Sequence, residues 1–197
     1  MTQVPSPPGV VVFAASAAAL KQRMEEVNRL NVFPVPDGDT GTNMTLTLDA
    51  VMTDLDRLGS DASIADVCHA ITHGSLMGAR GNSGVILSQM LRGLCEVVAE
   101  STEFTPAVVA SALERSVQVA FQAVRKPVEG TMLTVLKDAS IAARAGVAAG
   151  LPLDEFLDAV VQAAFESVRR GPDLLPVLKE NGVVDAGGFG LAILAEG

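Results

Sequence analysis

The chain has 197 residues, of which 49% are hydrophobic, 19% charged and 4% aromatic, and its formal net charge is −9. A chain of this length can bury roughly 70% of the surface that its unfolded form exposes, so it needs no disulfide scaffold. The acidic balance, without any Lys/Arg cluster, argues against a nucleic-acid partner. The longest apolar stretch, residues 9–20, is too short to span a membrane and follows no basic residue of a secretory signal. We therefore expect a cytoplasmic protein in which Cys68 and Cys95 are reduced core thiols.

Residues 1–8 contain three prolines and predict a disordered tail before a single domain at residues 9–197. Alanine- and leucine-rich segments follow, and Thr105 before Pro106 and Asn181 before Gly182 are typical helix boundaries. Because no segment alternates polar and apolar residues as a half-buried strand does, we predict an all-α fold, an up-and-down antiparallel bundle or barrel of about eight helices. The expected helices cover residues 10–29, 43–58, 63–78, 84–101, 106–125, 131–149, 153–170, 173–180 and 188–195.

Three of the predicted connections are rich in glycine, Asp, Asn, Ser and Thr, which a simple helix-to-helix turn does not require. They are residues 31–43, 78–84 and 182–190. In an up-and-down bundle these three connections can meet at one end. The sequence therefore predicts a polar site there.

The first connection contains Asp37, Gly38 and Asp39. Glycine lets the backbone turn freely, so both carboxylates can point into one small volume, and such a pair suits Mg²⁺ that also binds phosphate oxygens. The alternative is an ordinary Asp-Gly turn with two solvated carboxylates. The following residues 40–43, Thr-Gly-Thr-Asn, lead into a helix and offer N–H groups and hydroxyls to a phosphate, which favours the magnesium site.

The other polar segments are less specific by themselves. Residues 78–84 could hold a phosphate at the start of a helix or form a common glycine-rich turn, and they are not a P-loop because no lysine stands at the required place. Thr131 could cap its helix or contact a ligand, and Met132 suits either the core or a ligand site. His69 and His73 share a helix face but have no third ligand, so we interpret them as ordinary histidines, and neither cysteine has the setting of a catalytic thiol.

Three strings together resemble the family of the dihydroxyacetone kinase L subunit. They are LNVFPVPDGDTGTNM at residues 30–44, GARGNSGVILSQ at residues 78–89 and NGVVDAGGFG at residues 181–190. Within that family the chain is similar to the N-terminal nucleotide-binding domain of the bacterial fatty acid kinase A subunit, over nearly its whole length from residue 10. The resemblance implies a barrel of eight antiparallel helices that holds ATP and magnesium at one end.

The resemblance also assigns residues to the site. Asp37 and Asp39 match catalytic magnesium ligands, and Asn31 stands where the dihydroxyacetone kinases have a third Asp. A neutral amide binds Mg²⁺ more weakly than a carboxylate, so Asn31 could bind the metal directly, through water or not at all. The nucleotide (ATP or ADP) would contact the matching residues Thr40, Gly41, Thr42, Asn43, Asn82, Ser83, Gly84, Thr131, Met132, Asp185, Gly187 and Gly188.

The implied reaction transfers the γ-phosphoryl group of ATP to the carboxylate of a fatty acid that a separate lipid-binding carrier protein presents. Two alternatives stay open: a dihydroxyacetone kinase L-type subunit that works with a sugar-binding partner, and a nucleotide sensor without catalysis. The apolar segment at residues 191–197 suggests a domain excised from a longer chain. The expected partners are thus the carrier protein and downstream domains, and a homodimer formed through those domains is a further option.

Overall fold

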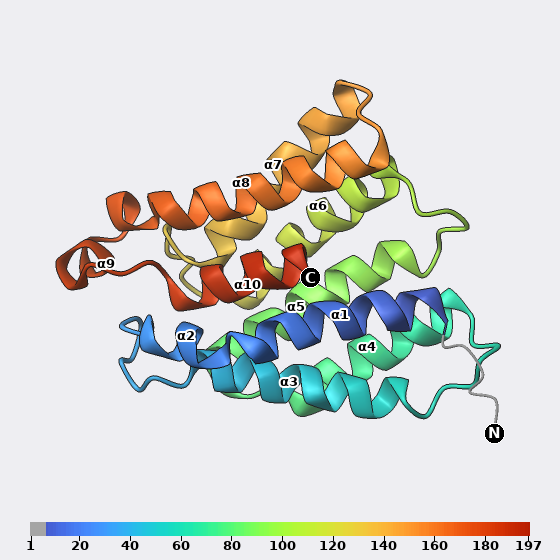
Figure 1. Cartoon of the computed structure of the whole chain (residues 1–197), viewed down its shortest axis with the longest axis horizontal. Helices are drawn as coiled ribbons and strands as arrows, with labels where there is room; N and C mark the ends of the chain where they lie inside the picture. Colours follow the sequence, from blue (N-terminus) through green and yellow to red (C-terminus); the bar gives the residue numbers. More distant parts are fainter. Residues whose placement is uncertain (1–6) are drawn as a thin grey trace.

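The computed structural model describes residues 7–197, and this part of the chain forms ten α-helices and no β-strand (Figure 1). Eight helices have 11 to 22 residues, and α2 and α9 have six each, so the predicted all-α bundle of about eight helices is confirmed. The helices are α1 (Pro8–Gln22), α2 (Met24–Arg29), α3 (Thr40–Leu55), α4 (Ile64–Gly78), α5 (Gly81–Val98), α6 (Pro106–Ala123), α7 (Met132–Ala148), α8 (Leu153–Leu174), α9 (Pro176–Asn181) and α10 (Ala186–Glu196).

The N-terminal region differs from the expectation in two ways. The single helix predicted at residues 10–29 is divided at Arg23 into α1 and α2. The Arg23 guanidinium pairs with Glu26 at 2.8 Å and lies 4.7 Å from the ring centroid of Phe189 in α10, which anchors α2 to the end of the chain. Of the predicted tail at residues 1–8, residues 1–6 lie outside the described part, and Pro8 already begins α1, where its missing N–H costs nothing.

Consecutive helices from α3 to α8 pack against each other, and α10 returns to contact α7, α8 and α1. Because the direction alternates along this series, α3, α5 and α7 begin at the same end of the bundle, which lies on the left in Figure 1 together with α2, α9 and the start of α10. We call this the site end, formed by residues 28–43, 79–84, 128–132 and 182–188. Within the described residues, no helix combines the length and hydrophobicity of a membrane-spanning segment.

The core consists of three groups of buried apolar side chains, the largest of which includes Leu20, Met44 and Leu87 at the centre of the bundle. Cys68 and Cys95 lie together in another group and are free thiols, as predicted. A hydrogen bond with Cys68 and burial raise the pKa of the Cys95 thiol, so this sulfur stays protonated and is a poor nucleophile.

Gly93 lets α5 and α6 touch through their backbones. A Cβ at this position would lie 2.5 Å from the Cα of Ser116, and the Ser116 hydroxyl donates a hydrogen bond to the Met90 carbonyl at 2.9 Å. The Gly93→Ala variant should therefore lower the Tm by roughly 3–10 °C, because overpacking of this kind costs about 1–3 kcal/mol. Thermal unfolding followed by circular dichroism measures this, with Arg92→Ala on the exposed face as the control. A raised Tm would contradict this prediction, because alanine has the better helix propensity and would stabilise α5 if the two helices were loosely packed.

Candidate functional site

The two predicted metal ligands stand just before α3. Asp37 is exposed, Asp39 is half-buried, and Gly38 between them has a φ of +69°, a conformation that favours glycine. Asp39 is the N-cap residue of α3, yet its side chain makes no capping hydrogen bond. An aspartate at this position normally accepts a hydrogen bond from a free N–H of the first turn. The Asp39 carboxylate is thus left free of the helix that it begins.

Two asparagines hold the first turn of α3 instead. The Asn28 Oδ1 accepts the N–H of Thr42 at 3.0 Å, and its Nδ2 donates to the Thr42 hydroxyl at 3.0 Å. The Asn31 Oδ1 accepts the N–H of Thr40 at 3.0 Å and also the Thr40 hydroxyl. Both threonine N–H groups are therefore engaged within the protein, which explains why α3 begins at Thr40 rather than at residue 43 as predicted.

Asn31 is buried, and both ends of its amide have partners: the oxygen bonds to Thr40, and the Nδ2 donates to the Val35 carbonyl at 2.7 Å. A metal ion at the amide oxygen would have to share it with these donors. The role of Asn31 as a magnesium ligand stays a prediction. Sequence reasoning missed Asn28, whose only signal was its position one helical turn before Asn31.

The second glycine-rich segment meets the first, as expected. Gly81 has a φ of +58°, and a Cβ there would lie 2.4 Å from the Asn43 Nδ2. A Cβ at Gly84 would lie 2.4 Å from the Thr47 Oγ1, which also accepts the Arg80 N–H at 3.2 Å. The start of α5 is thus in direct contact with the first two turns of α3. Its first turn carries the predicted residues Asn82, which is exposed, and Ser83, which is half-buried.

The third segment is fastened to α7. Asp185 is buried, and its Oδ2 accepts the N–H of Gly188 at 2.7 Å; the carboxylate also accepts the N–H of Met132. Burial raises the pKa of Asp185 to about 6, although both hydrogen bonds act in the opposite direction. One side chain therefore ties the start of α10 to the start of α7.

The glycines after Asp185 have a packing function. A Cβ at Gly187 would lie 3.3 Å from the Met132 Sδ, and one at Gly188 would lie 2.9 Å from the Val135 Cγ2. Both glycines and Met132 are buried. Their expected contacts with a nucleotide stay a prediction, since close helix packing already accounts for the small residues.

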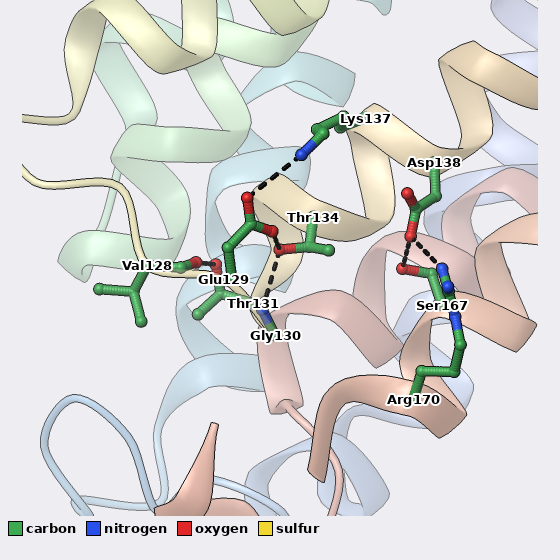
Figure 2. Close-up of polar contacts among 9 residues, drawn as sticks. All are labelled: Val128, Glu129, Gly130, Thr131, Thr134, Lys137, Asp138, Ser167 and Arg170. Atoms are coloured by element: carbon green, nitrogen blue, oxygen red, sulfur yellow. Dashed lines mark hydrogen bonds and ion pairs between the residues drawn. The ribbon is translucent and has the colours of Figure 1, made fainter. Parts of the chain in front are cut away.

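Hydrogen bonds fix the segment that leads into α7 (Figure 2). Thr131 does not cap the helix, and its hydroxyl donates to the Val128 carbonyl at 2.7 Å. Glu129 accepts the Thr134 hydroxyl at 2.8 Å and pairs with Lys137 at 3.1 Å, and these two contacts, with Thr134 the larger, lower the Glu129 pKa. Sequence reasoning missed this network.

A second network in Figure 2 joins α7 to α8. Asp138 accepts the Ser167 hydroxyl at 2.5 Å and the Arg170 guanidinium at 2.6 Å. Asp138 lies in the second turn of α7, Ser167 and Arg170 lie in α8, and none of the three was a predicted site residue. The hydrogen bonds among Asp138, Ser167 and Arg170 link α7 to α8, and this structural role explains their arrangement.

The remaining candidates do not join the site. His69 and His73 are exposed and stacked on α4, and the His73 Nδ1 lies 2.7 Å from an Asp54 oxygen. Within residues 7–197, no group of three His, Cys, Asp or Glu side chains could hold a metal ion. A shallow hollow between α6 and α7, lined by Glu114 and Arg144 among others, contains none of the predicted residues.

The chain belongs to the DAK2 domain family, whose model matches residues 34–197. It is 47% identical over 183 residues to protein YloV of Bacillus subtilis and 45% identical over 181 residues to an uncharacterised protein of Staphylococcus epidermidis. These matches cover 93% and 92% of the chain but 33% of each relative, so the chain spans about one third of the length of these relatives.

The fold is similar to two solved structures of the dihydroxyacetone kinase of C. freundii. The native form matches with a TM-score of 0.72, and the complex with AMP-PNP and Mg²⁺ with a TM-score of 0.71. Each match covers all of this chain and 35% of that enzyme, at 20% identity. At this identity the likeness shows the fold, and the sequence resemblance to the dihydroxyacetone kinase L-subunit family is confirmed by the family match.

The buried Asp185 predicts a pH effect on stability. In the folded chain this carboxyl keeps its proton up to about pH 6, whereas in the unfolded chain it releases the proton near its ordinary pKa of 3.8. The free energy of unfolding therefore falls as the pH rises through this interval. The Asp185→Asn variant has no such proton, so its Tm should rise by several degrees relative to that of the parent between about pH 4 and pH 7. A Tm difference that is constant over this range would contradict the raised pKa.

Proposed function

We propose that this DAK2 domain binds ATP with magnesium at the site end and transfers the γ-phosphoryl group to the carboxylate of a fatty acid. The observation that carries the proposal is the free Asp39 carboxylate beside Asp37, at the start of a helix whose first turn other residues cap. The C. freundii enzyme, which has a similar fold, has been crystallised with AMP-PNP and Mg²⁺. The whole-protein activity is a proposal, since the chain spans about one third of the YloV length.

The donor set suits magnesium. Asp37 and Asp39 supply carboxylate oxygens that water can reach, and Mg²⁺ typically binds one or two carboxylates together with phosphates and several waters. Bound there, the ion would neutralise part of the triphosphate charge, which a chain of net charge −9 otherwise repels. We assign these two aspartates as its ligands and Asn31 as a residue that supports them through Thr40.

Residues of α3 and α5 would contact the phosphates. The Asn28 Nδ2 donates to the Thr42 oxygen, so the Thr42 hydroxyl proton is free to bond a phosphate. Asn82, Ser83 and Gly84 lie at the start of α5. The N–H of Gly84 donates to the Arg80 carbonyl at 2.9 Å, so the helix dipole and the N–H groups of Asn82 and Ser83 are what favour an anion there. Asn43 lies between the two helix starts through its contact with Gly81. We place the adenine beside Thr131 and Met132, near Asp185.

The acceptor carboxylate requires no general base. A carboxylic acid with a pKa near about 4.3 is already ionised at neutral pH, so positioning and electrostatics can supply the catalysis. An alcohol acceptor such as dihydroxyacetone would benefit more from a base. We therefore favour the fatty acid over the sugar-type acceptor, with a lipid-binding carrier protein as the partner that presents it.

The aspartate pair provides the first test of this proposal. Asp37→Ala and Asp39→Ala should each abolish magnesium-dependent binding of AMP-PNP, measured by calorimetry, while the Tm stays within about 2 °C of the parent because neither side chain is in the core. Asp56→Ala, which removes an exposed carboxylate at the other end of α3, is the control. If both site variants bind AMP-PNP like the parent, the pair is an ordinary turn.

The acceptor is tested with labelled ATP. The domain alone should transfer little phosphate to free oleate, and the full-length chain with a lipid-loaded carrier should transfer it rapidly, because delivery by a partner can supply about 7–11 kcal/mol of the barrier through positioning. Dihydroxyacetone, offered with a sugar-binding partner subunit, is the competing acceptor. Transfer only to dihydroxyacetone would exclude the fatty acid role, and tight ATP binding without any transfer would indicate a sensor.

A further inference from the structure

The cap of α3 is supplied by a residue from another helix. The first three residues of α3 are Thr40, Gly41 and Thr42, and an N-cap aspartate usually accepts the N–H of the second or the third of them. Here the N–H of Thr42 binds the Asn28 Oδ1 at 3.0 Å. Asn28 belongs to α2, so a residue of another helix already occupies the Thr42 N–H that Asp39 could otherwise cap.

The orientation of the Asn28 amide is fixed by its partners. A backbone N–H can only donate, so the atom that faces the Thr42 N–H must be the amide oxygen. The other atom is then the NH₂ group, which lies 3.0 Å from the Thr42 hydroxyl and donates to it. Asn28 is half-buried, which restricts competition from water for these two bonds.

Close contact between α2 and α3 makes this arrangement possible. A Cβ at Gly41 would lie 2.3 Å from the Met24 carbonyl oxygen and 3.0 Å from the Asn28 Oδ1. Only a glycine allows the two backbones to approach this closely. The side chain of Asn28 can then reach Thr42 in the first turn of α3.

We propose that Asn28 is a positioning residue for the cation site: by capping α3 in place of Asp39, it keeps the Asp39 carboxylate free to bind Mg²⁺. The inference rests on the proposed function, because it concerns the same metal. Without Asn28, the Thr42 N–H and the cation compete for Asp39. Magnesium binding must then first break a helix cap, and the affinity for the ion falls.

The test is a double-mutant cycle on the full domain with Asn28→Ala, Asp39→Ala and the combination of both. The Tm of the ligand-free protein is measured by circular dichroism, and the Mg²⁺ concentration for half-maximal AMP-PNP binding is measured by calorimetry. The control is Thr105→Ala, because Thr105 caps α6 through the Val108 N–H at 3.3 Å and is not a predicted site residue.

The two readouts should move differently. Asn28→Ala should lower the Tm only slightly, because Asp39 takes over the cap, and should raise the Mg²⁺ midpoint about 5- to 10-fold. In the Asp39→Ala background no carboxylate can replace the cap, so Asn28→Ala should lower the Tm by roughly 2–6 °C more than it does in the parent. Thr105→Ala should lower the Tm by a similar amount with an unchanged Mg²⁺ midpoint.

Additive Tm changes in the cycle would overturn the proposal, because they show that Asp39 does not substitute for Asn28. An unchanged Mg²⁺ midpoint in Asn28→Ala would also overturn the proposal. This holds even if the variant binds AMP-PNP more weakly, because that loss would come from the Thr42 hydroxyl and not from the metal site. If the parent itself does not bind AMP-PNP with Mg²⁺, the proposed function fails; the Tm cycle still reports whether Asp39 replaces Asn28 as the cap.

Discussion

The alternating direction of the packed helices is the constraint on which the site depends. Because α3, α5 and α7 are every second helix of the bundle, their N-termini lie at one end, and α10 starts there as well (Figure 1). Each helix start presents unpaired N–H groups and the positive end of a helix dipole. In a chain of net charge −9, this end gathers partial positive charge without a cluster of basic side chains. The topology itself therefore favours an anionic ligand at this end.

The four helix starts are not equivalent. Those of α7 and α10 are closed by Asp185, which accepts an N–H from each of them while it is buried. The start of α3 is closed by Asn28 and Asn31, which leaves the Asp39 carboxylate outside the cap. The start of α5 has no side-chain cap. Polar groups without a cap thus concentrate between α3 and α5, whereas the polar groups at the starts of α7 and α10 are bonded to one another.

The sequence was sufficient for the features that local chemistry determines. Thr105 caps α6 and Gly182 ends α9 with a φ of +65°, as their residue types predicted. The break at Arg23 was not predicted, and Arg23 there contacts Phe189, a residue distant in the sequence. Asn28 was missed because its role depends on contact between two helices. Its capping function arises only because Gly41 lets α2 touch α3, and nothing within α2 alone indicates it.

Glycine-rich composition at a helix start has two physical origins here, and the structure separates them. Gly38 and Gly81 have positive φ values and are exposed beside Asp37 and Asn82, so they shape a surface that a ligand can reach. Gly187 and Gly188 are buried because α10 packs closely on α7. Of these four glycines, the sequence analysis assigned only Gly187 and Gly188 to the nucleotide, because composition alone does not separate the two origins. The exposed glycines favour an arrangement in which the charged part of a ligand lies against α3 and α5. The buried glycines allow α10 to pack closely on α7.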